Sequence, residues 1–231
     1  MQTPSFASSV AKNSGHACSL PHCSLRRHGL YLWCKDHALR ARRYGHPSAG
    51  PLSTKLWAAE RRMVADLFAR NVTHKGQLQA LEWVGGLVAQ ATHNVGAMKG
   101  GEELARLARH GIKSIDILTE LCAVTAYLDA NPRAAPDNRA WDYAVSSAVF
   151  KLAPRPRRIT RTPGTPWGVT VKAGSGNSYA PKPRTSALAF VGRHLRQSLA
   201  PFIANVQRSI QSRDAQRKAF EAELSAPLSA F

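Results

Sequence analysis

Acidic residues are scarce in this sequence. Fourteen Asp and Glu stand against 32 Lys and Arg, which leaves a formal net charge of +18. A compact protein with this much charge of one sign repels itself and attracts polyanions, so DNA, RNA or an anionic membrane surface is the expected partner. The same scarcity disfavours a catalytic metal site made of carboxylates, because the acidic residues are few and scattered.

Long apolar runs are also missing. The stretch from Ile115 to Leu128 is interrupted by Asp116 and Glu120, and it is shorter than the roughly 20 residues that a membrane-spanning helix needs. The first fifteen residues lack the apolar region of a secretory signal. We therefore expect no membrane partner and a cytoplasmic, nucleoid-associated location. In such reducing surroundings, the four cysteines are better interpreted as thiols or metal ligands than as disulfides.

Apolar residues make up 44% of the chain, which is enough for a packed core. Between residues 51 and 152 they recur at helical spacing, with Asp137 as a predicted N-cap and Ser114 as the cap of the best helix, which stops before Pro132. Residues 153–185 hold six prolines, four glycines and no acidic residue. This density of helix breakers predicts an irregular segment with at most a short strand over 167–172. Residues 186–231 resume the helical spacing, with a kink expected at Pro201.

Three cysteines and a histidine are grouped near the N-terminus. Four residues separate Cys18 from Cys23, ten more precede Cys34, and two lie between Cys34 and His37. Three thiolates and one imidazole are a complete ligand set for a tetrahedral structural Zn²⁺. The alternative is that free thiols are grouped here by chance. The remaining cysteine, Cys122, falls on the apolar stripe of its helix and is interpreted as a core thiol.

The residues around these ligands resemble a known family. The run GLYLWCKDHALRARRYGHP is similar to the small zinc module common at the ends of phage and mobile-element proteins. Seven positions match its pattern: Gly29, Cys34, His37, Arg40, Arg43, Gly45 and Pro47. The sequence departs from it at Ala38, Ala41 and His46, where Tyr, Trp and Asp are usual. The resemblance covers about thirty residues and implies nucleic-acid binding, since such modules accompany HNH-type endonucleases, recombination endonucleases and phage DNA-binding proteins.

Two groups of cations are predicted to contact nucleic acid. The first lies on the helix expected after Cys34 and consists of Lys35, Arg40, Arg42 and Arg43, with Gly45 as the helix stop. The second, in the Pro/Gly-rich segment, consists of Arg155, Arg157, Arg158 and Arg161, with Trp167 and Tyr179 interleaved. The alternatives are a solvated charged helix for the first group and a plain basic linker for the second.

No catalytic residue set stands out. The sequence contains no G-x-x-x-x-G-K-S/T phosphate loop, and its His-Asn pair, His93-Asn94, ends a predicted helix instead of lying in the ββα hairpin of an HNH nuclease. These absences favour a binding protein over an enzyme.

We therefore expect a mainly α protein. Its predicted parts are a disordered N-terminus (1–15), a zinc-binding module (16–50), an α-helical body (51–152), the basic Pro/Gly-rich segment (153–185) and a long C-terminal helix (186–231). The expected role is DNA binding for a phage, plasmid or integrative element, as a regulator or as a replication or recombination accessory, with a second copy or a nucleoprotein complex as further partner. The alternatives are a structural or assembly subunit that binds RNA or DNA through its basic ends, and a diverged nuclease.

Overall fold

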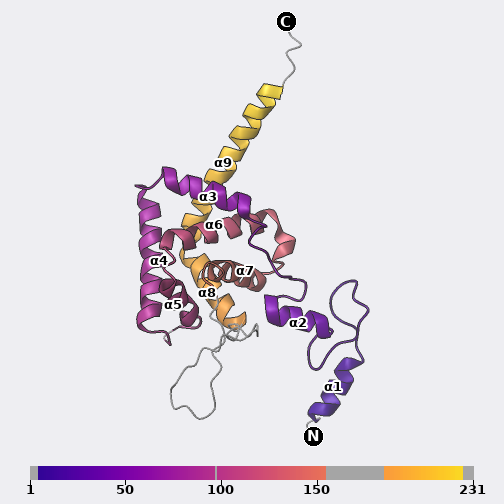
Figure 1. Cartoon of the computed structure of the whole chain (residues 1–231). Coiled ribbons are helices and arrows are strands. Elements are labelled where there is room, and N and C mark those ends of the chain that lie inside the picture. Colours follow the sequence, from indigo (N-terminus) through magenta and orange to yellow (C-terminus); the bar gives the residue numbers. More distant parts are fainter. Residues whose placement is uncertain (1–4, 97, 155–184, 226–231) are drawn as a thin grey trace, which may run out of the picture.

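The computed structural model describes residues 5–96, 98–154 and 185–225, which form a helical protein (Figure 1). The helices are α1 (Phe6–Ser14), α2 (Lys35–Tyr44), α3 (Ala58–Arg70), α4 (Lys75–His93), α5 (Gly101–Arg109), α6 (Ser114–Ala130), the 3₁₀ helix η1 (Pro132–Ala134), α7 (Asn138–Phe150), α8 (Thr185–Ser198) and α9 (Ala200–Ser225). Over these ranges there is no strand, only an isolated antiparallel bridge between Ala17 and Arg26. The predicted mainly α class is confirmed. Among the described helices, none is long and apolar enough to cross a bilayer.

The core is centred on α6, which lies among α3, α4, α7 and α9. Leu118, Leu121 and Val124 of α6 are fully buried, as expected for a helix with neighbours on most sides. Leucine, valine and isoleucine side chains of α8 and α9 belong to this same core. The C-terminal helices are therefore part of the helical body, although residues 153–185 separate them from it in the sequence.

Helices α7 and α8 pack unusually closely. A Cβ on Gly192 of α8 would lie 1.7 Å from the carbonyl oxygen of Asp142 in α7, so only glycine allows the two backbones to approach in this way. The buried Asp142 carboxylate accepts hydrogen bonds from Arg196 (2.9 Å) and Arg193 (3.3 Å) of α8. Residues 155–184 between these helices, with the predicted contacts Arg155, Arg157, Arg158 and Arg161 and the strand at 167–172, lie outside the described residues.

Two buried charges hold other elements together. Glu120 of α6 accepts hydrogen bonds from Arg61 at 2.6 and 3.0 Å and from the Trp57 indole at 2.8 Å. Arg106 of α5 donates to the carbonyl oxygen of Phe150, the last residue of α7, and to that of Ala153 just beyond it. The last carbonyls of a helix have no partner within their own helix. Glu120 and Arg106 therefore connect neighbouring elements of the helical body.

The helix ends agree only partly with the sequence analysis. Asp137 caps α7 as predicted, by accepting from the Ala140 amide. Ser114 is instead the first residue of α6, whose cap is Lys113. At Pro201, in the first turn of α9, the two C-terminal helices meet after a break at Leu199, because proline fits a helix start and not its interior.

The N-terminus differs from the expected disorder. Residues Phe6–Ser14 form α1, which Ser5 caps by accepting a hydrogen bond from the Ser8 amide. Asn13 near the end of α1 donates to the carbonyl oxygens of Gly29 and Tyr31. This helix has no buried residue, so its sequence shows little of the apolar periodicity from which a helix is predicted.

Candidate metal centre

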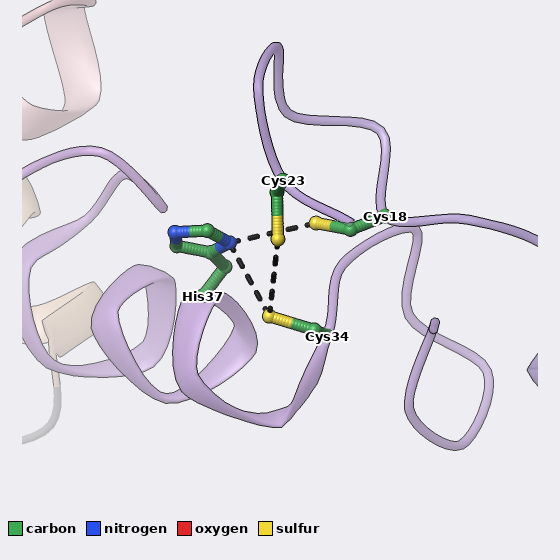
Figure 2. Close-up of side chains that lie close together, drawn as sticks. All are labelled: Cys18, Cys23, Cys34 and His37. Carbon is green, nitrogen blue, oxygen red and sulfur yellow. Dashed lines mark hydrogen bonds between the residues drawn. The ribbon is translucent and has the colours of Figure 1, made fainter. Parts of the chain in front are cut away.

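The four predicted ligands converge on one point in the structure. The ligand atoms of Cys18, Cys23, Cys34 and His37 all lie within 4.8 Å of one another. His37 Nδ1 is 3.3 Å from Cys34 Sγ and 3.5 Å from Cys18 Sγ, and the sulfurs of Cys23 and Cys34 are 3.9 Å apart (Figure 2). All four cysteines of the chain are free, and these separations exceed a disulfide bond by far. The cluster can hold a metal ion.

Backbone hydrogen bonds in the loop 16–34 bring the ligands together. The Cys18 amide donates to the Leu25 carbonyl (2.8 Å) and the Arg27 amide to the His16 carbonyl (3.0 Å), which closes a hairpin that carries Cys18 and Cys23. Cys34 is the N-cap residue of α2, and His37 lies in the first turn of that helix. The two halves of the site are therefore a hairpin and a helix start.

The surroundings of Cys18 favour a thiolate. Burial of this thiol opposes its ionisation, but hydrogen bonds from the backbone of Leu20 and Cys34 and from the His37 side chain outweigh burial and lower the pKa to about 6. At Cys23, a backbone hydrogen bond from Leu25 lowers the pKa. Burial and the neighbouring thiols of Cys18 and Cys34 together outweigh this hydrogen bond, so the pKa of Cys23 is raised. Without a metal, one thiolate forms easily and a second beside it is opposed by their repulsion.

Residues 5–44, which we call the metal-binding region, have almost no apolar core of their own. Among residues 5–44, only Cys18, Cys34, Ala38 and Ala41 are buried. The loop 16–34 thus has little besides its hydrogen bonds and the ligand cluster to define its conformation. In a segment of this kind, metal binding supplies much of the folding free energy.

Helix α2 joins the metal-binding region to the helical body. Gly45, with φ of +86°, ends the helix as predicted, and a Cβ there would lie 3.0 Å from the Arg139 carbonyl oxygen of α7. The Thr185 hydroxyl at the start of α8 donates to the Arg42 carbonyl oxygen. The end of α2 is therefore fixed against α7 and α8 (Figure 1).

The other candidates from the sequence lie elsewhere. His16, His22 and His28 are exposed and are not in the ligand cluster. Cys122 is fully buried, and burial raises its pKa to about 12. His93 is at the exposed end of α4, with Nδ1 2.8 Å from the Ala89 carbonyl oxygen. These positions agree with the interpretation of Cys122 as a core thiol and give His93 a local structural contact.

Family models, curated proteins and solved structures contain no match to this chain. The resemblance to the zinc module of phage and mobile-element proteins thus rests on the sequence pattern, to which the structure adds the convergence of the four ligands.

The first group of predicted nucleic-acid contacts is exposed on α2. Lys35, Arg40, Arg42 and Arg43 are all exposed on α2, whereas Ala38 and Ala41 of the same helix are buried. None of the four cations forms an ion pair within the described residues.

Two neighbouring features were missed by the sequence analysis. Arg139 is an exposed cation whose backbone lies against Gly45, a proximity created by the fold. Leu30, Tyr31 and Leu32 are at least half exposed. Only their position between two metal ligands in the sequence could have indicated a surface loop.

Proposed function

We propose that this chain is a zinc-containing protein that binds nucleic acid, with DNA favoured, in the setting of a phage, plasmid or integrative element. The observation that carries the proposal is the fixed arrangement of a Cys₃His cluster and an exposed cationic helix that begins inside it. In this proposal the metal shapes the module, and α2 supplies the contacts to phosphate.

The dimensions of the cluster support zinc. In a tetrahedral site with Zn–S bonds of about 2.3 Å and a Zn–N bond of about 2.0 Å, two sulfurs are about 3.8 Å apart and a sulfur and a nitrogen about 3.5 Å apart. The structure has 3.9 Å for one sulfur pair and 3.3 and 3.5 Å for two sulfur–nitrogen pairs. Thiolates and imidazole also select zinc over the hard cations that prefer oxygen ligands. Four protein ligands complete the tetrahedron, so the proposed ion is structural.

The electrostatics support nucleic acid as the partner. Residues 1–35 contain no acidic side chain, and Asp36 is the first in the chain. The α2 cations therefore have few competitors for a bound phosphate, and arginine can hold phosphate through two hydrogen bonds. Since α2 is fixed against α7 and α8, binding through this helix would also orient the helical body on the nucleic acid.

The proposal is tested by the salt dependence of binding. Fluorescence anisotropy of a labelled duplex would be compared for the zinc-loaded protein and for a variant with Lys35, Arg40, Arg42 and Arg43 changed to Gln. Each phosphate contact contributes about 0.9 to the slope of log K against log salt, so the loss of four should reduce it by about 3.6. The matched control changes Arg62, Arg70, Lys75 and Lys99 to Gln, which removes the same charge from exposed positions elsewhere.

The two variants have equal net charge, so a non-specific charge effect would change both slopes alike. An equal change would contradict a contact through α2, and a wild-type protein that fails to bind nucleic acid would contradict the proposed function itself. Metal-dependent nicking of the duplex by the zinc-loaded sample would instead favour the diverged nuclease.

The position of α9 favours one alternative, the assembly subunit. This helix extends to Ser225 and projects beyond the helical body (Figure 1). A second copy of the chain or another protein could therefore pack against it. Such a subunit would form a complex of defined mass and bind duplexes of different sequence equally. A regulator should instead prefer its own site by on the order of a thousandfold at physiological salt.

A further inference from the structure

The metal-binding region exposes three consecutive large apolar side chains. Leu30, Tyr31 and Leu32 are 56%, 50% and 55% exposed, and we call these three residues the apolar tip. Single apolar residues at a surface are ordinary, but adjoining ones on a small, charged region indicate a contact surface. Leu25 in the preceding hairpin is also 54% exposed, which extends the apolar character of this region.

The backbone of the apolar tip is held firmly. The Tyr31 amide donates to the His28 carbonyl (3.1 Å) and the His28 amide to the Trp33 carbonyl (2.9 Å), which closes a turn in which Gly29 has φ of +58°. The side-chain amide of Asn13 donates to the carbonyl oxygens of Gly29 and Tyr31, both at 2.8 Å.

A second layer of contacts fixes Asn13 and the hairpin together. Arg27 donates to Asn13 Oδ1 at 3.4 Å, to the Ala17 carbonyl oxygen at 3.0 Å and to Ser19 Oγ at 3.0 Å. The tip is thus exposed on an ordered loop, and a partner that contacts it would have little loop entropy to remove.

The charge around the apolar tip selects an anionic partner. Lys12, Arg26 and Lys35 are exposed in the same N-terminal region, and the chain has no acidic residue before Asp36. A rigid aromatic and two aliphatic side chains next to cations suit nucleic-acid bases, since aromatic side chains stack on bases and leucines wedge between them while cations contact the phosphates.

We propose that the apolar tip binds unstacked bases, and that the substrate class is therefore DNA with unpaired bases: single strands, gaps or mismatches. Tyr31 stacks on an exposed base, and Leu30 and Leu32 pack against its neighbours. This proposal rests on the proposed function and adds the kind of nucleic acid. Tyr31 and Lys35 are four residues apart, at most about 14 Å of extended chain, so the tip and α2 can reach the same strand.

The test separates apolar contacts from phosphate contacts by the salt dependence of binding. The probes are a labelled single strand of about 20 nucleotides and the duplex of the same sequence. The test variant changes Leu30, Tyr31 and Leu32 to Ala. The control variant changes Leu56, Val72 and Leu78 to Ala, which are 48%, 63% and 50% exposed on other elements. Metal content, measured for each protein, reports that the cluster is intact.

A lost stacking contact weakens binding by about 5- to 150-fold per base. We expect the test variant to lose at least about tenfold in affinity for the single strand, with an unchanged salt slope because no counterion is released at an apolar contact. Binding of the duplex should change less, and the control variant should bind as the wild type does. Tyr31→Phe should retain the affinity that Tyr31→Ala loses.

Two results would overturn the proposal while leaving nucleic-acid binding intact. One is equal single-strand affinity of the test variant and the wild type. The other is a test variant that loses only self-association in sedimentation, which would make the apolar tip a protein contact. A wild-type protein that binds neither probe would instead contradict the proposed function.

Discussion

The reactivity of the four thiols should report the metal site and the core separately. With a metal bound, the sulfurs of Cys18, Cys23 and Cys34 are ligands, and Cys122 is fully buried in α6, so none should react quickly with a thiol reagent. A chelator should release three thiols at once, because the loop 16–34 loses its ligand cluster. Denaturant should then release the fourth.

The difference in rate follows from burial. Burial raises the pKa of Cys122 to about 12, so at pH 8 only about one thiol in 10⁴ is ionised, roughly a thousandfold less than for an ordinary cysteine. Its reaction also needs an opening of the core, which multiplies this delay. The thiols of Cys18, Cys23 and Cys34 lose the ligand cluster on chelation and should then react together, at about the rate of ordinary cysteines.

A second signal shows whether the helical body survives the loss of metal. The buried core is formed by residues between Ala49 and Ile210, outside the ligand loop, so circular dichroism should retain most of its helical signal after chelation and the main melting transition should move little. Four fast thiols after chelation would show that the body unfolds with the metal site. Unchanged reactivity after complete chelation would refute a metal role in the cluster.

Two further predictions concern the helix contact and the ligands. Gly192→Ala places a Cβ 1.7 Å from the Asp142 carbonyl oxygen and should lower the free energy of unfolding by about 3 kcal/mol or more, seen in calorimetry as a fall in Tm of roughly 6–12 °C. The control Gly86→Ala, whose Cβ would have no atom within 4 Å, should be neutral or stabilising by about 1 kcal/mol. Equal effects of the two substitutions would contradict the close contact. Acid should release the metal. The pKa of Cys18 is lowered to about 6 despite burial, so this thiol is ionised above that pH and protonated below it, and bound metal moves the release to a still lower pH. Metal content, followed with a chromophoric chelator, should fall by about pH 4, and full retention of metal at that pH would argue against thiolate ligands.

The sequence predicted the elements that depend on local pattern. The ligand spacing from Cys18 to His37 and the helix stop at Gly45 are local features, and both appear in the structure. The helical class followed from apolar spacing, which a helix displays directly in its sequence. Asp137 was recognisable as a cap because its side chain acts on an amide only three residues away.

Features that depend on distant parts of the chain could not be predicted in this way. Gly192 is an unremarkable glycine until α7 lies against it, and Arg139 approaches Gly45 only once the body has folded. Glu120 interrupts an apolar stripe, and its buried position is explained by Arg61, 59 residues away. The turn that exposes Tyr31 and its neighbours is held by the Asn13 side chain on α1, 16 and 18 residues away from the carbonyl oxygens to which it donates.

The anchoring of the chain at Pro154 and at Thr185 has a consequence for how this protein can vary. Arg106 holds the carbonyl oxygens of Ala153 and Pro154, and Thr185 is tied to the end of α2, so both ends of the 30-residue interval 155–184 are fixed by contacts that do not involve it. A change at Arg106 or Thr185 would therefore alter where the chain leaves α7 or enters α8, so these two positions are less free to vary than exposed positions without such contacts.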